Sequence, residues 1–381
     1  MKEIILHIGH GKTGSSYLQS CLALNRDKLL DIGMDYPVHS SFKEAKRGGI
    51  SSGNGALFLK NYLNAESLSE QNKILYSSEN LFRHRSLSRT FPKILEEEWL
   101  SKALEYFGPK IKIIVFTRNL FEISFSIWGQ YIKRGGGKHD LNTFLKLTTN
   151  SNPYNDLLEW LNLSSKYNCQ INLRNYSNHK DNLLNVFLED LIGKKAKIED
   201  FIQPKNKNVN RSLTFSEYEV QRICNFLNTS KPDLSDLLVN ELPDIKSMEI
   251  KCSMESYNIV KNANIEVINN INNQIDKNES IKIESPEAVT YKENNIQHTF
   301  LTEEQIKIIT SYLENNTNKE KSVDKLGIDQ IRDIALKIAS NQSLDLSNAL
   351  SLMKIAQSLR PGGAFIKSKV KEWESELNQE R

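Results

Sequence analysis

The sequence has little cysteine and no long apolar segment. Its four cysteines are scattered, without a CxxC pair or a Cys/His pair at metal-ligand spacing: Cys21, Cys169, Cys224 and Cys252. In that pattern they are expected to be reduced thiols. No apolar run approaches the roughly 20 residues that span a bilayer, and the stretch 4–8 is too short for the hydrophobic region of a signal peptide. The sequence therefore predicts a cytoplasmic protein without a transmembrane segment.

The chain also lacks a strong charge of either sign. Its 50 lysines and arginines nearly balance 47 aspartates and glutamates, which leaves a formal net charge of +3. Since the basic residues are dispersed, this balance argues against a dedicated nucleic-acid-binding protein, although a local basic cluster can still bind a small anion. The length of 381 residues allows one sizeable core with an appendage, or two domains.

What the first half does contain is an alternation of apolar and amphipathic segments. The apolar segments predict buried strands at 3–8, 73–77, 111–117 and 170–174. Helical patterns lie at 15–30, 92–107, 121–134 and 155–167. Such alternation is typical of a parallel sheet with crossover helices. We therefore expect an α/β, three-layer fold with a central, mostly parallel sheet and helices on both faces.

The second half is more polar. Isoleucines recur at helical spacing between Ile259 and Ile275, and a helical hairpin with a further helix is expected around the Pro-Gly-Gly break at 361–363. The glycine- and serine-rich stretch 38–55 is predicted to be an exposed loop. The predicted division is an α/β domain at 1–230, a polar helical extension at 231–320 and a C-terminal helical hairpin at 321–381.

The segment HIGHGKTGSS, residues 7–16, follows the first predicted strand and enters a helix. This arrangement brings backbone N–H groups and the positive end of a helix together, which creates an anion site. Lys12 adds a mobile charge, and Ser15 and Ser16 add hydroxyl donors. An ATP-binding P-loop would require glycine where the chain has Leu6. The loop is therefore predicted to be a phosphate cradle of another kind, the alternative being a tight turn that merely needs its glycines.

A second basic element follows the third predicted strand. That strand ends in Arg118, at the edge where open α/β sheets bind ligands, rather than in the aspartate that would help to hold magnesium. Ser126 follows two helical turns later. Arg118 and Ser126 can therefore bind one phosphate, Arg118 through two hydrogen bonds of its guanidinium and Ser126 through its hydroxyl. A capped helix with a salt-bridged arginine is the alternative.

The segment KTGSS after the first strand, and TRN followed by Ser126, resemble the sulfotransferase family. Its members use 3′-phosphoadenosine 5′-phosphosulfate (PAPS). The resemblance covers about residues 1–215, is closest to bacterial carbohydrate sulfotransferases, and implies a P-loop-like fold and no metal. Arg118 and Ser126 match its 3′-phosphate element. Its 5′-phosphosulfate loop would consist of Gly11, Lys12, Thr13, Gly14, Ser15 and Ser16.

The same resemblance extends to two later segments. INLRNYSNH is similar to a family strand whose tyrosine lies near the adenine, which would be Tyr176, with a core aromatic as the alternative. NVNRSL lies where the family places a further loop over the 3′-phosphate, which makes Arg211 and Ser212 candidates. The Lys-Gly-rich signature of the cytosolic hormone-type members is absent from that position.

Sulfuryl transfer from PAPS places growing negative charge on the leaving phosphate oxygen. We expect Lys12 to stabilise that charge. The family uses histidine or glutamate as the base for the acceptor proton. Glu79, directly after a predicted strand, is the leading candidate, with His84 and His39 as alternatives. A helix-capping role is the alternative for Glu79.

The expected acceptor is a hydroxyl of a carbohydrate or glycolipid. Two other classes stay open: a P-loop-type small-molecule or sugar kinase, which would depend on magnesium, and a non-catalytic nucleotide- or glycan-binding protein. Retention of both Lys12 and Glu79 argues against the non-catalytic class. The sequence does not define the sugar, the oligomeric state or the role of residues 231–381.

Overall fold

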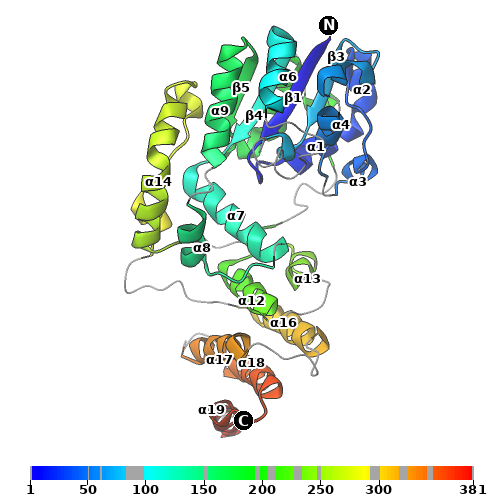
Figure 1. The fold of residues 1–381 in the computed structure, drawn as a ribbon. Coiled ribbons are helices and arrows are strands. Elements are labelled where there is room, and N and C mark those ends of the chain that lie inside the picture. The colour runs from blue at the N-terminus through cyan, green and yellow to red at the C-terminus, as the bar shows by residue number, and fades with distance from the viewer. Residues whose placement is uncertain are drawn as a thin grey trace. The chain divides into compact units, whose positions relative to one another are not determined.

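The computed structural model contains a sheet of five parallel strands (Figure 1). The structure describes residues 2–49, 51–60, 62–82, 98–134, 136–149, 153–193, 198–204, 211–226, 234–246, 250–291, 301–316, 325–340 and 346–379. The strands are β1 (Glu3–Gly9), β2 (Met34–Asp35), β3 (Lys73–Ser77), β4 (Ile111–Thr117) and β5 (Gln170–Asn175). The predicted α/β class and parallel sheet are confirmed.

The strands stand in the order β2-β3-β1-β4-β5. The chain leaves β1 towards β2 and β3 on one side, and it leaves β4 towards β5 on the other, so the direction of winding reverses between β1 and β4. Open α/β sheets bind ligands outside the carboxyl ends of their strands at such a reversal. Here the reversal lies where Gly9 of β1 pairs with Phe116 of β4.

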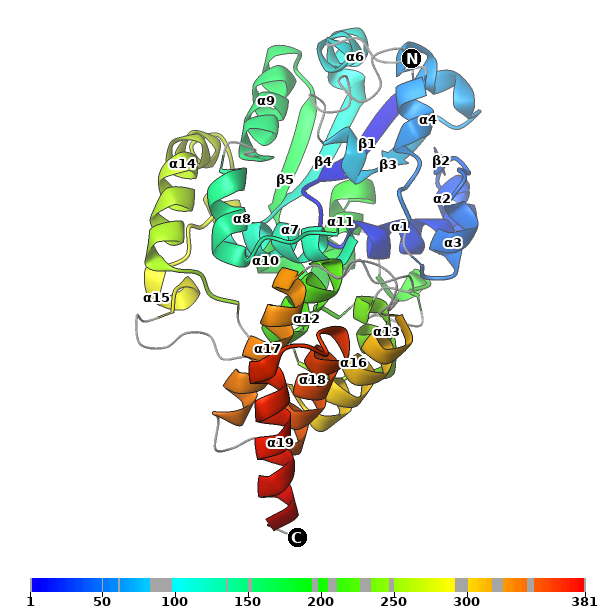
Figure 2. The same ribbon diagram turned by 60° about the horizontal axis from the view of Figure 1, so that its bottom comes forward.

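The chain divides into two compact units, which are described separately. The first comprises Met1–Ser124, Thr148–Val209 and Asn258–Glu284, and the second comprises Phe125–Leu147, Asn210–Tyr257 and Ser285–Arg381. The predicted boundaries at 230 and 320 do not coincide with this grouping. Figures 1 and 2 show the chain's elements from two directions.

The first unit holds the sheet and eight of the described helices. These are α1 (Ser15–Leu24), α2 (Arg26–Asp31), α3 (Phe42–Lys46), α4 (Gly55–Lys60), α6 (Trp99–Phe107), α9 (Pro153–Lys166), α10 (Tyr176–His179) and α11 (Leu183–Ile192). Two longer helices, α7 (Leu120–Arg134) and α14 (Met254–Asn272), have residues in both units. The predicted helix at 15–30 is divided at Asn25, and the start of the one predicted at 92–107 lies outside the described residues.

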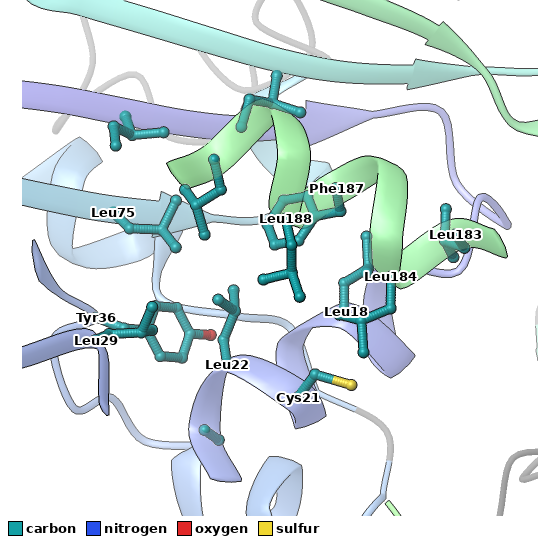
Figure 3. Close-up of a cluster of buried hydrophobic side chains, with 14 of the residues drawn as sticks. Leu18, Cys21, Leu22, Leu29, Tyr36, Leu75, Leu183, Leu184, Phe187 and Leu188 are labelled. Carbon is teal, nitrogen blue, oxygen red and sulfur yellow. The ribbon is translucent and has the colours of Figure 1, made fainter. Parts of the chain in front are cut away.

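One face of the sheet is covered by α1 and α11. Figure 3 shows Leu22 of α1 and Phe187 and Leu188 of α11 beside Leu75 of β3, and all four side chains are buried. Complete burial of such a side chain stabilises the fold by about 1.5–3 kcal/mol relative to its exposure. This apolar contact fixes α1, the helix that follows the loop, against the sheet.

The opposite face of β1 is also buried, at Ile4, Leu6 and Ile8. On that side Trp160 of α9 donates from its indole Nε1 to the carbonyl oxygen of Phe82, 3.1 Å away. The helices α6 and α9 pack against each other. Both faces of the strand are therefore covered, as a parallel sheet requires.

The stretch 38–55 differs from the predicted exposed loop. It contains α3, and its Asn54 side chain is buried. Asn54 Nδ2 donates to the carbonyl oxygen of Leu75, and Ser77 N donates to Asn54 Oδ1 at 2.6 Å. Because β2 pairs only with the start of β3, the Asn54 amide completes the hydrogen bonding of β3 towards its carboxyl end.

The second unit is helical in its described part. It contains α12 (Phe215–Phe226), α13 (Leu234–Glu241), α15 (Pro286–Val289), α16 (Glu303–Asn316), α17 (Lys325–Ala339), α18 (Leu346–Leu359), α19 (Ala364–Gln379) and nearly all of α8 (Leu141–Thr148). Contacts join α17 to α18 and α18 to α19. Among the described residues, no helix combines the length and apolar character needed to cross a membrane.

The isoleucine stripe predicted between 259 and 275 is partly wrong. Ile268 and Ile271 of α14 are buried, but Ile265 is 37% exposed. Buried Val260, Asn264 and Val267 share the covered side with the two buried isoleucines. The apolar face of α14 therefore includes residue types that an isoleucine count omits.

Replacement of Asn54 by alanine leaves the backbone groups of Leu75 and Ser77 without this side-chain partner. We expect Asn54→Ala to lower the free energy of unfolding by about 1–3 kcal/mol, measured by denaturant unfolding followed by circular dichroism. Ser52→Ala is the matched control, because Ser52 is exposed in the same stretch. Equal stability of the two variants would contradict a structural role for the Asn54 amide.

Candidate functional site

The candidate site begins where β1 meets β4. His10 N donates to the carbonyl oxygen of Phe116 at 3.0 Å. A Cβ atom on Gly9 would lie 2.6 Å from that same oxygen, so only glycine permits the two strands to approach this closely. The loop that follows β1 therefore starts at the reversal of the strand order.

The loop then turns through two left-handed residues. Lys12 has a φ of 68° and Gly14 a φ of 77°. Thr13 Oγ1 donates to the carbonyl oxygen of His10 at 2.7 Å, which closes the turn. Gly14 precedes the first residue of α1, and a Cβ atom on it would lie 2.4 Å from Leu183 Cδ2. This turn leads directly into a helix N-terminus and leaves Lys12 exposed.

Glu79 lies against this loop. It follows β3 in a short 3-10 helix, η2 (Glu79–Leu81), and Ser15 Oγ donates to its Oε1. Its Oε2 lies 3.4 Å from the position that a Cβ atom on Gly11 would take. The cap of η2 is supplied by Ser78, whose Oγ accepts from Asn80 N at 3.3 Å. The capping role considered for Glu79 is thus filled by its neighbour.

Arg118 reaches the loop from the end of β4. Its Nη1 donates to the carbonyl oxygen of Lys12 at 2.9 Å. Its guanidinium carbon lies 5.1 Å from the ring centroid of Tyr176, within the range of a cation–π contact. Tyr176 Cε2 in turn lies 3.4 Å from the position of a Cβ atom on Gly14. The structure therefore brings three separately predicted elements together: the loop 9–16, Arg118 and Tyr176.

Two charged residues that the sequence reasoning missed lie beside Arg118. Arg118 Nη2 and Lys180 Nζ are each 2.9 Å from Glu122 Oε2. Burial by itself raises the pKa of Glu122, but hydrogen bonds and charge from Lys180 and Arg118 outweigh it, so the pKa lies below its usual value. The i,i+4 spacing of Arg118 and Glu122 was a signal for their pairing. Nothing local in the sequence indicated Lys180.

The remaining predicted donor residues belong to the second unit. Ser126 lies on α7, and Arg211 and Ser212 precede α12. Arg211 forms a two-point ion pair with Glu217, at 2.7 and 2.8 Å, and also donates to the carbonyl oxygens of Leu238 and Leu242. These bonds fasten α12 to α13. Donor binding by Ser126, Arg211 and Ser212 stays a prediction.

Of the histidines considered as bases, His39 is half-buried and His84 lies outside the described residues. Burial lowers the pKa of His39, whose Nδ1 and Nε2 lie 3.1 Å from Ser41 Oγ and 3.3 Å from Tyr36 Oη. His7 is a core residue: its Nδ1 lies 2.8 Å from Ser77 Oγ, and burial lowers its pKa to about 3. Ser15 of the loop 9–16 donates a hydrogen bond to Glu79. Among the described residues, no such contact joins this loop to His39.

Comparisons with known proteins found no matching family model, no matching curated protein and no matching solved structure. Assignment of a function therefore depends on the geometry of the first unit and on the short motifs of the sequence.

The conformation of Gly14 provides a test of the loop. We expect Gly14→Ala to destabilise the first unit by about 1–2 kcal/mol, because an L-residue is strained at this φ and its Cβ would meet Leu183. Gly11→Ala is the control, since its Cβ would have no contact shorter than 3.4 Å. Denaturant unfolding of both variants gives the comparison. Equal losses in the two would contradict the described turn.

Arg211 provides a test of the second unit. Arg211→Ala would leave the fully buried Glu217 carboxylate without its ion pair, so we expect a loss of about 3–5 kcal/mol in the stability of this unit. Hydrogen exchange of α12 amides measures the loss, and Ser212→Ala is the control, since its side chain is exposed. Unchanged exchange together with weakened nucleotide binding would instead favour the predicted donor role.

Proposed function

We propose that the chain is a sulfotransferase that transfers a sulfuryl group from PAPS to a hydroxyl of a glycan or glycolipid. The observation that carries this proposal is the meeting of the glycine loop, Arg118 and Tyr176 at the carboxyl edge of β1 and β4. Such an edge can hold a nucleotide with two separate phosphate groups. The P-loop-like character of the fold, the role of the C-terminal helices as an extension and a cytoplasmic location are parts of the same proposal.

The donor's 5′-phosphosulfate would lie on the loop before α1. Backbone N–H groups at a helix N-terminus favour an anion there, and the exposed Lys12 side chain adds a full charge. The hydroxyl of the half-buried Ser16 is a further donor at the start of α1. These groups lie within one turn of the chain.

The donor's 3′-phosphate would be bound by Arg118. The buried Nε of this arginine has no hydrogen-bond partner among the described residues. A buried donor without a partner costs about 1–3 kcal/mol, and a bound anion is one group that would supply the partner. The ring of Tyr176 against the guanidinium restricts its plane and offers a surface beside the nucleotide.

In the reaction, the acceptor oxygen attacks sulfur, and the bond between sulfur and the donor's phosphate oxygen breaks. Lys12 would stabilise the charge that grows on that phosphate oxygen. Glu79 would take the acceptor proton, since its carboxylate lies beside the loop. Ser15, which donates to Glu79, would orient this carboxylate.

One observation favours a second candidate, a P-loop-type kinase. In nucleotide enzymes of that class, a loop hydroxyl and a carboxylate after a neighbouring strand hold magnesium. Ser15, after the loop that follows β1, and Glu79, after β3, form such a hydroxyl–carboxylate pair, and β1 and β3 are adjacent strands. Among the described residues, no group of three or more His, Cys, Asp or Glu side chains is arranged to hold a metal ion. A kinase would therefore have to complete its magnesium site with substrate phosphates and water.

Calorimetric titration separates the two candidates. Without magnesium, we expect adenosine 3′,5′-bisphosphate to bind at least tenfold more tightly than AMP, and Lys12→Ala and Arg118→Ala each to weaken it by about tenfold or more. With magnesium present, ATP should gain no advantage. Tighter binding of magnesium–ATP than of the bisphosphate would favour the kinase and overturn the sulfotransferase.

Glu79→Gln tests the base within the same proposal. The amide retains an oxygen that can accept from Ser15, so bisphosphate affinity should stay within about twofold, while sulfate transfer from labelled PAPS to a panel of oligosaccharides should fall about 10²- to 10⁴-fold. His39→Gln is the control. Normal transfer by Glu79→Gln would show that Glu79 is not the base.

A further inference from the structure

Two cations of the first unit converge on one carboxylate oxygen. Arg118 Nη2 and Lys180 Nζ both lie 2.9 Å from Glu122 Oε2, although Lys180 is 62 positions away from Arg118 along the chain. Asn119 Nδ2 lies 3.5 Å from the other oxygen, Oε1. A single anionic oxygen thus touches both positive side chains at the carboxyl edge of the sheet.

Glu122 compensates only part of this charge. Arg118 and Lys180 carry two positive charges, and the Glu122 carboxylate that both of them contact supplies one negative charge. Arg118 remains tied to the loop through the carbonyl oxygen of Lys12 while it pairs with Glu122. The arrangement can therefore accept an anion of higher charge than a carboxylate.

The exposure of these side chains shows which of them a ligand can reach. Lys180 is 44% exposed, Glu122 27% and Arg118 15%. Arg118 is held in place by its loop contact and by the Tyr176 ring. Lys180 and Glu122 are the more accessible members, so both can move when an anion arrives.

We infer that Lys180 is a second ligand for the donor's 3′-phosphate, beside Arg118, and that this phosphate displaces the Glu122 carboxylate from both cations. The inference rests on the proposed function and adds to it a residue and an exchange of counter-ions. A phosphate monoester carries up to two negative charges and three terminal oxygens, so it can accept from Arg118 and Lys180 at once. Glu122 holds the two cations at one point before the exchange.

The two members of the exchange have opposite expected effects. Loss of Lys180 removes a phosphate ligand, so Lys180→Met should weaken the binding of adenosine 3′,5′-bisphosphate about tenfold. The affinity for AMP should not change, because AMP has no 3′-phosphate. Loss of the Glu122 charge removes the group that competes with the phosphate for Arg118 and Lys180. Glu122→Gln should therefore strengthen the binding of the bisphosphate by about threefold or more, again without an effect on AMP binding. Lys180→Arg retains the charge and should keep most of the affinity.

Isothermal titration of each variant with the two nucleotides measures these effects. Lys110→Met is the matched control, because Lys110 is an exposed lysine directly before the first residue of β4, whereas Arg118 follows the last one. Lys180 takes part in a partly exposed ion pair, which stabilises a protein by about 0–1 kcal/mol, so the thermal unfolding of Lys180→Met should match that of the wild type.

Each outcome decides the inference. If the wild type does not prefer the bisphosphate to AMP, both the proposed function and the inference fall. If the wild type has this preference and Lys180→Met retains it, only the inference falls. If Glu122→Gln weakens bisphosphate binding as much as Lys180→Met does, Glu122 positions the two cations in the bound state as well. The proposed displacement of Glu122 by the phosphate is then wrong.

Discussion

The hydrogen bond from Arg118 Nη1 to the carbonyl oxygen of Lys12 is the contact on which the rest of the candidate site depends. It joins the end of β4 to the loop after β1, at the point where the strand order reverses. The loop that carries this carbonyl passes through left-handed residues at Lys12 and Gly14. The chain enters α1 directly after this turn, and the apolar side of α1 packs against α11. Packing, turn and charge therefore support one geometry.

The charges around this edge alternate in sign. Glu79 accepts from Ser15 on one side of the loop, and Glu122 lies between Arg118 and Lys180 on the other. Such pairing limits the cost of gathering cations in a partly desolvated place. It also prepares the cations for an anion, because Glu122 holds Arg118 and Lys180 next to each other before one binds. The same carboxylates that stabilise the free protein are thus neighbours of the groups that would bind a donor.

The second unit uses an arginine differently. Arg211 forms a buried ion pair with Glu217 and donates to two carbonyl oxygens. Gln305 of α16 donates a further hydrogen bond to the Glu217 carboxylate. Burial raises the pKa of Glu217, but the bonds from Arg211, Gln305 and Thr214 outweigh it and bring the pKa below its usual value. A short motif in the sequence shows that an arginine is present, but only its surroundings show what it pairs with.

The sequence by itself determined the strands β1, β3, β4 and β5 to within a residue, because β1, β3 and β4 are mainly apolar runs and β5 alternates polar with apolar residues. It also determined the glycine loop and the arginine after β4, since local chemistry limits which residues can form them. The two-residue strand β2 and the buried amide of Asn54 were beyond it, because neither has a periodic pattern. Only the tertiary structure brought Glu79 to Ser15 and Lys180 to Glu122. Those pairs are separated by dozens of residues, and folding of the sheet, rather than any local preference, decides which of them meet.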